Sequence, residues 1–305
     1  MPLRIAFQDQ FSGYENGVFF TVLSAVAGDA VEITAPNKAD LIIIGPFNSK
    51  KRDYRKALGK LGIGDDRPSS GALRLYQCYE NMRDNGVAAD YRIESDLKPH
   101  SDRYFRLPAW VGTIDWSHEG FRNRPSPRVE KLLTIEQLMR PLGPALLNRP
   151  RQAALMTTHM REPRRMLFDT LSRIMPTQGF GRPFDPSIRS HNDSGFAKDV
   201  VLRDFAVNLC PENSLYPGYY TEKIIDAYGA GCLPVTWTDP NVRVDFNPKA
   251  FVNALDFAAI GYEDGLREAL TPEKMAEYAE QPLFLEAPSI EPLAEFLRRV
   301  IGDAR

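Results

Sequence analysis

The stretch from Phe205 to Trp237 carries the densest group of polar and charged side chains that could do chemistry. Its apolar start, polar middle and apolar end, with helical spacing of Ile224, Ile225 and Tyr228, predict a strand, a long loop, a helix and a second strand. Ligands bind where loops leave the carboxyl ends of parallel strands, so we expect a binding site there. The candidate side chains are Glu212, Asn213, Ser214, Tyr219, Thr221, Glu222 and Lys223.

The start of the helix in this stretch suits an anion. Thr221 is expected to be the N-cap, which places Glu222 and Lys223 in the first turn. Unpaired backbone N–H groups and the positive end of the helix dipole favour a phosphate at that point. Spacing alone also fits an ordinary surface pair of charges, which is the commoner arrangement.

The usual motifs for holding phosphate are missing. The chain has no Asp-x-Asp pair for a divalent cation on a diphosphate, no Gly-x-x-x-x-Gly-Lys loop and no Gly-x-Gly-x-x-Gly fingerprint. A departing diphosphate would therefore be met by arginine, lysine and helix ends, with Arg182 and Lys223 as candidates. For Arg182, a solvated loop arginine is the alternative.

A candidate general base follows another predicted strand. Glu80 comes after the strand 72–78 and would act as a base if partial burial raised its pKa, although a chain with 40 acidic residues offers many carboxylates. The histidines show neither metal-ligand spacing nor a partner serine or cysteine, so we expect no metal site and no hydrolase triad. They are His100, His118, His159 and His191.

Strands alternating with helices must position these residues. In the first half the strands are expected at 3–7, 31–34, 41–44, 72–78, 89–93 and 104–107, with helices at 17–26 and 50–61. In the second half the strands are expected at 153–157, 205–209 and 233–237, with helices at 164–174 and 221–228. Short apolar runs in this rhythm indicate an α/β fold with largely parallel sheets.

A weak pattern between residues 112 and 150, basic and rich in proline, marks the boundary between two domains. We therefore predict an N-terminal domain over 1–145 and a C-terminal domain over 146–305. The amphipathic helix at 290–301 closes the chain, and it would pack either on its own domain or back on the first.

Composition excludes several functional classes. The 305 residues carry 38 Lys and Arg against 40 Asp and Glu, so bulk charge gives no reason to bind nucleic acid or anionic membrane. We see no export signal, and the longest aliphatic run, 41–44, is far shorter than the roughly 20 residues of a membrane span. Three scattered cysteines, Cys78, Cys210 and Cys232, indicate reduced core thiols in a cytoplasmic protein.

Three segments resemble a known family. The densest runs from Phe205 to Asn253 and includes Glu212-Asn213-Ser214, the run 220–227, Pro234-Val235 and the run 245–253. Weaker matches are Glu80-Asn81, Asn85, Asp90-Tyr91 and the run 102–108, and then Pro163-Arg164, Phe168-Asp169 and Gly181-Arg182. Together they resemble the α1,3/4-fucosyltransferases of glycosyltransferase family 10, most closely the bacterial members.

The resemblance implies a GT-B architecture, in which two Rossmann-like domains face a cleft. The first would hold the acceptor sugar and the second GDP-fucose. Glu80 would be the general base that deprotonates the acceptor hydroxyl, while Arg182 and Lys223 would stabilise the leaving diphosphate. The donor-binding residues would be Arg182, Asn213, Tyr219, Glu222 and Lys223.

The implied activity is an inverting transfer of L-fucose to O3 of N-acetylglucosamine or glucose, giving an α1,3 linkage, with α1,4 as the alternative. The implied partners are GDP-fucose and an acceptor glycan that is N-acetyllactosamine-like or belongs to lipopolysaccharide or capsule. No cofactor would be tightly bound, although Mg²⁺ or Mn²⁺ could stimulate by screening the diphosphate. Two alternatives stay open: a non-catalytic nucleotide-sugar-binding module, and a transferase of the same fold that uses another nucleotide-sugar. Pro211 and the loop 215–217 depart from the family pattern.

Overall fold

A computed structural model of the protein describes residues 1–10, 17–28, 31–47, 71–81, 87–125, 131–185, 187 and 198–305. The chain divides into two compact units. Unit 1 comprises Met1–Gly112, Trp116–Ser126 and Ser289–Arg305, and unit 2 comprises Thr113–Asp115 and Pro127–Pro288. Each unit is described by itself below.

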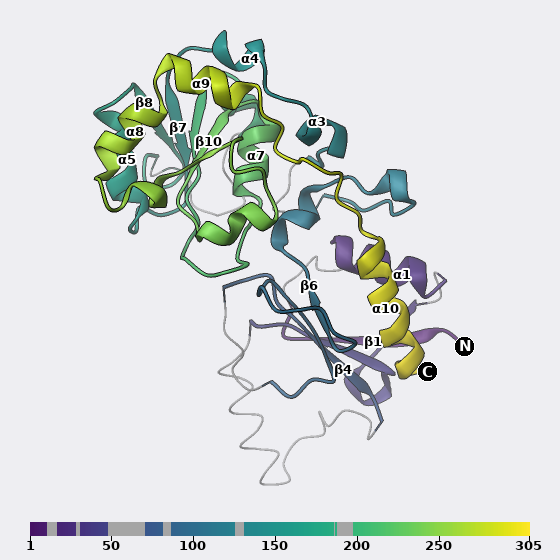
Figure 1. The fold of residues 1–305 in the computed structure, drawn as a ribbon. Helices are drawn as coiled ribbons and strands as arrows, with labels where there is room; N and C mark the ends of the chain where they lie inside the picture. Colours follow the sequence, from purple (N-terminus) through teal and green to yellow (C-terminus); the bar gives the residue numbers. More distant parts are fainter. Residues whose placement is uncertain are drawn as a thin grey trace. The chain divides into compact units, whose positions relative to one another are not determined.

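Unit 1 is built on a six-stranded sheet with the order β2-β1-β3-β4-β5-β6, in which every pairing is parallel (Figure 1). Its strands are β1 Leu3–Gln8, β2 Val31–Ile33, β3 Leu41–Ile44, β4 Leu73–Gln77, β5 Tyr91–Glu94 and β6 Tyr104–Arg106. All four residues of β3 are buried, as expected for a strand covered on both faces. This continuous aliphatic run is why the sheet centre could be placed from sequence.

Two helices from opposite ends of the chain pack together in unit 1. They are α1 Val18–Val26 and α10 Glu291–Ala304, drawn in purple and yellow (Figure 1). On α10 the Phe296 ring lies 5.8 Å from that of Tyr91 and 5.4 Å from that of Phe105, between ring centroids. The Tyr91 hydroxyl also donates to Asp303 Oδ2 at 2.5 Å. The structure therefore groups residues 289–305 with unit 1, whereas the predicted division gave them to the second domain.

Unit 2 is built on a five-stranded parallel sheet with the order β11-β10-β9-β7-β8. Its strands are β7 Ala153–Met156, β8 Thr177–Phe180, β9 Val207–Leu209, β10 Leu233–Thr236 and β11 Val252–Asn253. Both sheets of the molecule are thus parallel, and the predicted α/β class is confirmed.

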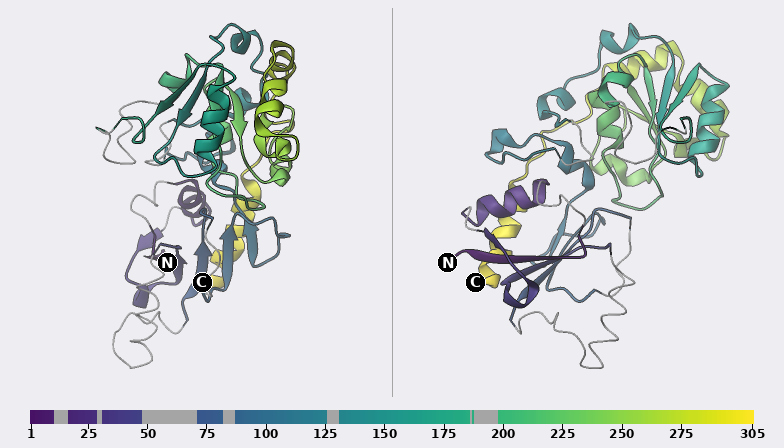
Figure 2. Two further views of the ribbon diagram at one scale, coloured as in Figure 1. Left: turned by 90° about the vertical axis from the view of Figure 1, so that its left-hand side faces the viewer. Right: turned by 180° about the vertical axis from the view of Figure 1, so that it is seen from behind.

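Helices cover both faces of the unit 2 sheet (Figure 2). Leu155 of β7 shares a core with α5 (Arg164–Ser172), α8 (Tyr262–Ala269) and α9 (Pro272–Ala279). The neighbouring Ala154 packs with Leu202 of α6 (Lys198–Leu202) on the other face. This alternation follows from the two-residue period of a strand. The helices of unit 2 are α3 Ile135–Met139, α4 Pro144–Leu147, α5 Arg164–Ser172, α6 Lys198–Leu202, α7 Lys223–Gly229, α8 Tyr262–Ala269 and α9 Pro272–Ala279. Short 3₁₀ turns are η2 Pro36–Lys38, η3 Ala109–Thr113, η4 Ser117–Glu119, η5 Pro240–Val244 and η6 Ala254–Phe257.

The strand order creates a switch point in each sheet. In unit 2 the chain leaves β7 to one side for β8 and then crosses to the other side for β9. Consecutive connections therefore diverge at the carboxyl ends of β7 and β9, which is where open α/β sheets bind ligands. In unit 1 the same divergence occurs between β1 and β3.

Most predicted elements are present with small shifts at their ends. The strand expected at 72–78 is β4 Leu73–Gln77, and the helix expected at 290–301 is α10. The sequence analysis missed β8 and β11, both at sheet edges, and the helices α4, α6, α8 and α9. The helix expected at 50–61 lies outside the described residues, as do Asn85 and His191.

Candidate functional site

An open pocket lies at the switch point of unit 2, with about 470 Å³ of empty space. It sits beside the carboxyl ends of β7 and β9, as the strand order requires. Its walls combine apolar and charged side chains. They are Leu155, Met156, Arg164, Lys198, Leu202, Asn208, Leu209, Cys210, Pro211, Glu222, Lys223 and Asp226.

A buried carboxylate organises one side of this pocket. Glu212, only 1% exposed, accepts hydrogen bonds from the backbone N–H of Thr221 at 2.8 Å and from its hydroxyl at 2.9 Å. It also accepts one from Lys223 Nζ at 2.8 Å. Burial would lower the pKa of Lys223, but Glu212 and Glu222 outweigh burial and raise it. The ammonium at the pocket is therefore held charged and fixed in place.

Thr221 does not cap the helix as predicted. The helix α7 begins at Lys223, and the N-cap position belongs to Glu222, which has helical dihedral angles and makes no side-chain capping bond. The Thr221 hydroxyl is engaged with Glu212 because that buried carboxylate needs several donors. The expected Thr221 cap is thus corrected, and Thr221 instead joins the strand-end loop to the start of α7.

Glu222 lines the pocket among mixed charges. Burial would raise its pKa, but the ammonium groups of Lys223 and Lys198 outweigh burial and lower it. The Lys223 Nζ atom lies 3.9 Å from Glu222 Oε1. The carboxylate is therefore kept in its hydrogen-bond-accepting form at the pocket wall.

A chain of polar contacts runs from the start of α5 to the loop after β9. The Arg164 side chain, 6% exposed, donates from Nη2 to Asn213 Oδ1, and its Nη1 lies 2.7 and 3.0 Å from the two ring nitrogens of His159. Asn213 Nδ2 in turn lies 3.5 Å from the hydroxyl oxygen of Tyr219, which is buried. Burial lowers the pKa of the Arg164 guanidinium, against the effects of nearby Glu212 and Tyr219.

The structure brings most of the predicted donor-binding residues together, with Arg182 as the exception. Asn213, Tyr219, Glu222 and Lys223 lie in and beside the pocket, linked by these contacts. Among the residues that the structure describes, the pocket lining contains Arg164, whereas Arg182 is exposed in the turn after β8.

Arg164 is a pocket residue that the sequence analysis did not single out as a candidate. Arg164 was quoted within the family resemblance, and its position three residues before Leu167 and seven before Leu171 places it on the buried face of α5. That spacing was the available signal. Glu212, which was among the predicted candidates, lies three residues beyond the end of the buried strand β9.

Glu80 belongs to unit 1 and is half-buried. It lies just beyond the carboxyl end of β4, the strand next to β3 and so close to the switch point of that sheet. The Cys78 thiol donates to the Glu80 backbone carbonyl at 3.3 Å, which fixes the turn that follows the strand.

Further properties of the described residues bear on function. No group of three His, Cys, Asp or Glu side chains in the described part of the chain could hold a metal ion. No helix in the same residues combines the length and the apolar character that a bilayer crossing demands. Cys78, Cys210 and Cys232 are all free and buried, as predicted. Burial raises the pKa of each thiol.

The segment that carries this pocket matches a known protein family. Residues 147–267 match the model of the C-terminal region of glycosyltransferase family 10, the fucosyltransferases. An alpha-(1,3)-fucosyltransferase of Helicobacter pylori is 28% identical over 280 residues, which cover 84% of this chain and 54% of that protein. The chain thus spans about half the length of that relative. A putative fucosyltransferase of Acanthamoeba polyphaga mimivirus is 27% identical over 108 residues, covering 32% of this chain and 18% of that protein.

Solved structures agree with the fold. A crystal structure of an alpha1,3-fucosyltransferase with GDP-fucose has a TM-score of 0.68 at 22% identity, covering 98% of this chain and 90% of that one. A second alpha1,3-fucosyltransferase crystal structure also has a TM-score of 0.68, at 24% identity, with 99% and 90% coverage. These likenesses show a GT-B type fold with two parallel α/β units. The family resemblance read from the sequence is confirmed by the match of residues 147–267 to the model of glycosyltransferase family 10.

Proposed function

We propose that this protein is an inverting fucosyltransferase that transfers L-fucose from GDP-fucose to a hydroxyl group of a glycan acceptor. One observation carries the proposal. Within the segment that matches family 10, two cations, Arg164 and Lys223, line one pocket at a sheet switch point together with the carboxylate of Glu222. A glycosyl transfer from a nucleotide-sugar needs this combination, because a cationic sugar ring separates from an anionic diphosphate.

On the donor side, we assign the diphosphate to Lys223 and Arg164. Both are positioned by carboxylate or amide partners, so they would act without having to reorganise. Glu222, Asn213 and Tyr219 would accept or donate hydrogen bonds to ribose and fucose hydroxyls. Arg182, which the family resemblance nominated, is exposed, and the geometry favours Arg164 in its place.

On the acceptor side, Glu80 is proposed as the general base. Its carboxylate would take the proton of the acceptor hydroxyl while the acceptor oxygen forms a bond to the anomeric carbon of fucose. The bond from that carbon to the β-phosphate oxygen breaks, and GDP leaves with the bonding electron pair. Attack from the opposite face inverts the configuration and gives an α1,3 linkage, or an α1,4 linkage on a differently oriented acceptor.

We further propose that no resident cofactor takes part. Guanidinium and ammonium groups would meet the diphosphate charge, and Mg²⁺ or Mn²⁺ would stimulate only by screening it. We place the enzyme in the cytoplasm, which the free, buried thiols suit. The acceptor would be N-acetyllactosamine-like or part of a lipopolysaccharide or capsule oligosaccharide.

An acceptor-array assay tests the proposal. The protein is incubated with GDP-fucose and lactose, N-acetyllactosamine and bacterial oligosaccharides, with and without EDTA, and the products are identified by mass spectrometry and NMR. We expect fucosylated product that persists in EDTA. GDP-fucose binding without transfer or donor hydrolysis would identify a binding module instead. Transfer from UDP- or GDP-linked sugars other than fucose would identify a transferase with another donor.

A further inference from the structure

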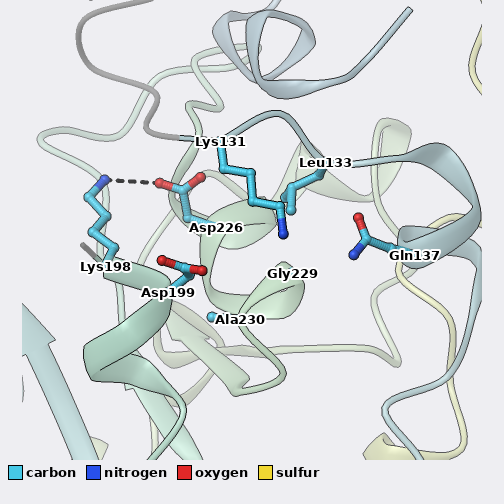
Figure 3. Close-up of a pocket in the computed structure, with 8 residues that line it drawn as sticks. All are labelled: Lys131, Leu133, Gln137, Lys198, Asp199, Asp226, Gly229 and Ala230. Atoms are coloured by element: carbon cyan, nitrogen blue, oxygen red, sulfur yellow. Dashed lines mark hydrogen bonds and ion pairs between the residues drawn. The ribbon is translucent and has the colours of Figure 1, made fainter. Parts of the chain in front are cut away.

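An ion pair separates the donor pocket from a second pocket in unit 2. Lys198 Nζ at the start of α6 lies 2.9 Å from Asp226 Oδ2 on α7, and both residues line both pockets (Figure 3). The second pocket has about 540 Å³ of empty space. Its remaining lining is Lys131, Leu133, Gln137, Asp199, Gly229 and Ala230. The Lys198–Asp226 pair is thus a shared wall.

The same lysine lines the donor pocket together with Glu222. Asp226 donates its backbone N–H to the Glu222 carbonyl at 2.8 Å, so the two acidic side chains lie one turn apart on the same side of α7. Lys198, from a different helix, is close enough to both to affect their titration. Its ammonium therefore compensates two neighbouring carboxylates.

The charges around Glu222 show why this lysine matters. Lys223 and Asp226 come from its own helix, Lys198 from α6, Arg164 from α5 and Glu212 from the loop after β9. Lys223 is already bonded to Glu212, and Arg164 to Asn213 and His159. Without the charge of Lys198, Glu222 would lie near two carboxylates, Asp226 and Glu212, and Lys223 is already bonded to Glu212. Nearby like charges disfavour the ionisation of a carboxyl group.

We propose that Lys198 is a positioning residue, held in place by Asp226, that keeps Glu222 ionised and directed into the donor pocket. This inference rests on the proposed function, in which Glu222 accepts hydrogen bonds from donor hydroxyls. Lys198 thereby acts on the sugar and ribose part of the donor through Glu222. It has no contact with the diphosphate in this scheme.

GDP and inorganic pyrophosphate distinguish an effect of Lys198 through Glu222 from a direct contact of Lys198 with the diphosphate. GDP has both ribose hydroxyls and a diphosphate, whereas pyrophosphate has only the latter. In Lys198→Met we expect GDP affinity to fall about 10-fold, the size of one charge-assisted hydrogen bond. Pyrophosphate affinity should stay within about twofold, both measured by calorimetry.

Two further variants serve as controls. Lys198→Arg keeps the charge and should restore GDP affinity to within about twofold of the wild type. Lys131→Met removes a lysine that lines only the second pocket, and it should leave GDP affinity unchanged. Thermal midpoints of all variants check that the fold is intact.

Acid titration supplies a readout that needs no ligand. Carboxyl ¹³C NMR on glutamate-labelled protein, with the Glu222 signal assigned by its loss in Glu222→Gln, should show this group titrating about one pH unit higher in Lys198→Met. The acid limb of GDP affinity should move to higher pH with it. An unmoved titration would overturn the inference, even if the wild type bound no GDP.

The remaining outcomes separate the two proposals. Equal losses of GDP and pyrophosphate affinity would show that Lys198 contacts the diphosphate directly, which contradicts a positioning role. Unchanged GDP affinity in Lys198→Met would contradict it as well. A wild-type protein that fails to bind GDP at all would instead refute the proposed function.

Discussion

Charged side chains in the donor pocket balance one another before any ligand enters. Glu212 is fully buried and paired with Lys223, and Asp226 is paired with Lys198. Removing Lys223 would leave the buried Glu212 carboxylate uncompensated, which costs about 3–5 kcal/mol. The Lys198–Asp226 pair is 39% and 23% exposed, so its loss should cost less. These pairs fix the cations of the pocket in place, which would suit the proposed role of meeting a diphosphate without rearrangement.

Substitutions of Arg164 and Arg182 test which of the two arginines serves the proposed diphosphate site. Arg164→Met should lower kcat/KM for GDP-fucose by about 10²–10³-fold, the usual effect of losing one preorganised donor to a developing anion. Arg182→Met is the matched control and should stay within about threefold of the wild type, since exposed arginines contribute little. Steady-state kinetics with varied donor would measure both. A larger loss in Arg182→Met than in Arg164→Met would reverse the assignment.

Glu80 is tested by an isosteric change. Glu80→Gln keeps the side-chain shape but cannot take a proton, so transfer should fall by at least about 10²-fold while GDP affinity stays unchanged. The transfer rate and calorimetric GDP binding are the two measurements. Full activity in Glu80→Gln would remove Glu80 from the mechanism.

Hydrogen bonds also hold the segment between β9 and α7, which carries Tyr219, against the chain just beyond β10. The Tyr220 hydroxyl donates to Asp239 Oδ1 at 3.1 Å, just beyond β10. Asn253 of β11 holds the adjacent Thr238, accepting from its N–H at 3.2 Å and donating to its carbonyl at 3.0 Å. The loop that carries Tyr219 is therefore fixed by two strands that make no part of the pocket wall.

This arrangement predicts a defined effect for Tyr220→Phe. Loss of the hydroxyl removes one hydrogen bond and leaves Asp239 with its Asn241 contacts, so stability should fall by about 1 kcal/mol. GDP should bind several-fold more weakly because the segment that carries Tyr219 is less well fixed. Urea unfolding and calorimetry would measure the two effects. Weaker GDP binding without any loss of stability would indicate that Tyr220 contacts the donor itself.

The sequence could predict the elements with strong apolar runs and could not predict those without them. β3 was placed exactly because Leu41–Ile44 is a continuous aliphatic run. β8 has the sequence Thr-Gln-Gly-Phe and lies at a sheet edge, so it lacks both alternation and burial. The predicted start of α7 was wrong because the Thr221 hydroxyl, which was expected to cap the helix, instead donates to the buried Glu212. Such tertiary competition is invisible to local patterns.

The chain passes from unit 1 to unit 2 and back to unit 1. The chain leaves unit 1 briefly after Gly112 and finally after Ser126, builds unit 2 and returns to unit 1 at Ser289 with α10. The returning helix buries Leu293, Phe296, Leu297 and Val300. Unit 1 is therefore a discontinuous unit whose core needs residues from both sides of unit 2.

A substitution in α10 should separate the unfolding transitions of the two units. Phe296 is fully buried, and Phe296→Ala should destabilise unit 1 by about 3–5 kcal/mol through the lost contacts and the cavity. GDP binding should persist at the temperature where unit 1 unfolds, since every lining residue of the donor pocket belongs to unit 2. Thermal scans with and without GDP would follow both units. Simultaneous loss of both would mean that they unfold cooperatively.

The return of α10 also bears on how the protein forms during synthesis. Domains commonly complete their folding from the N-terminus as the chain leaves the ribosome. Here the six strands of unit 1 are made first, yet the helix that covers Tyr91 and Phe105 is translated after the whole of unit 2. Unit 2 can close its core earlier. The nascent chain therefore carries an incompletely covered unit 1 sheet until α10 emerges, an interval in which chaperone binding would be most useful.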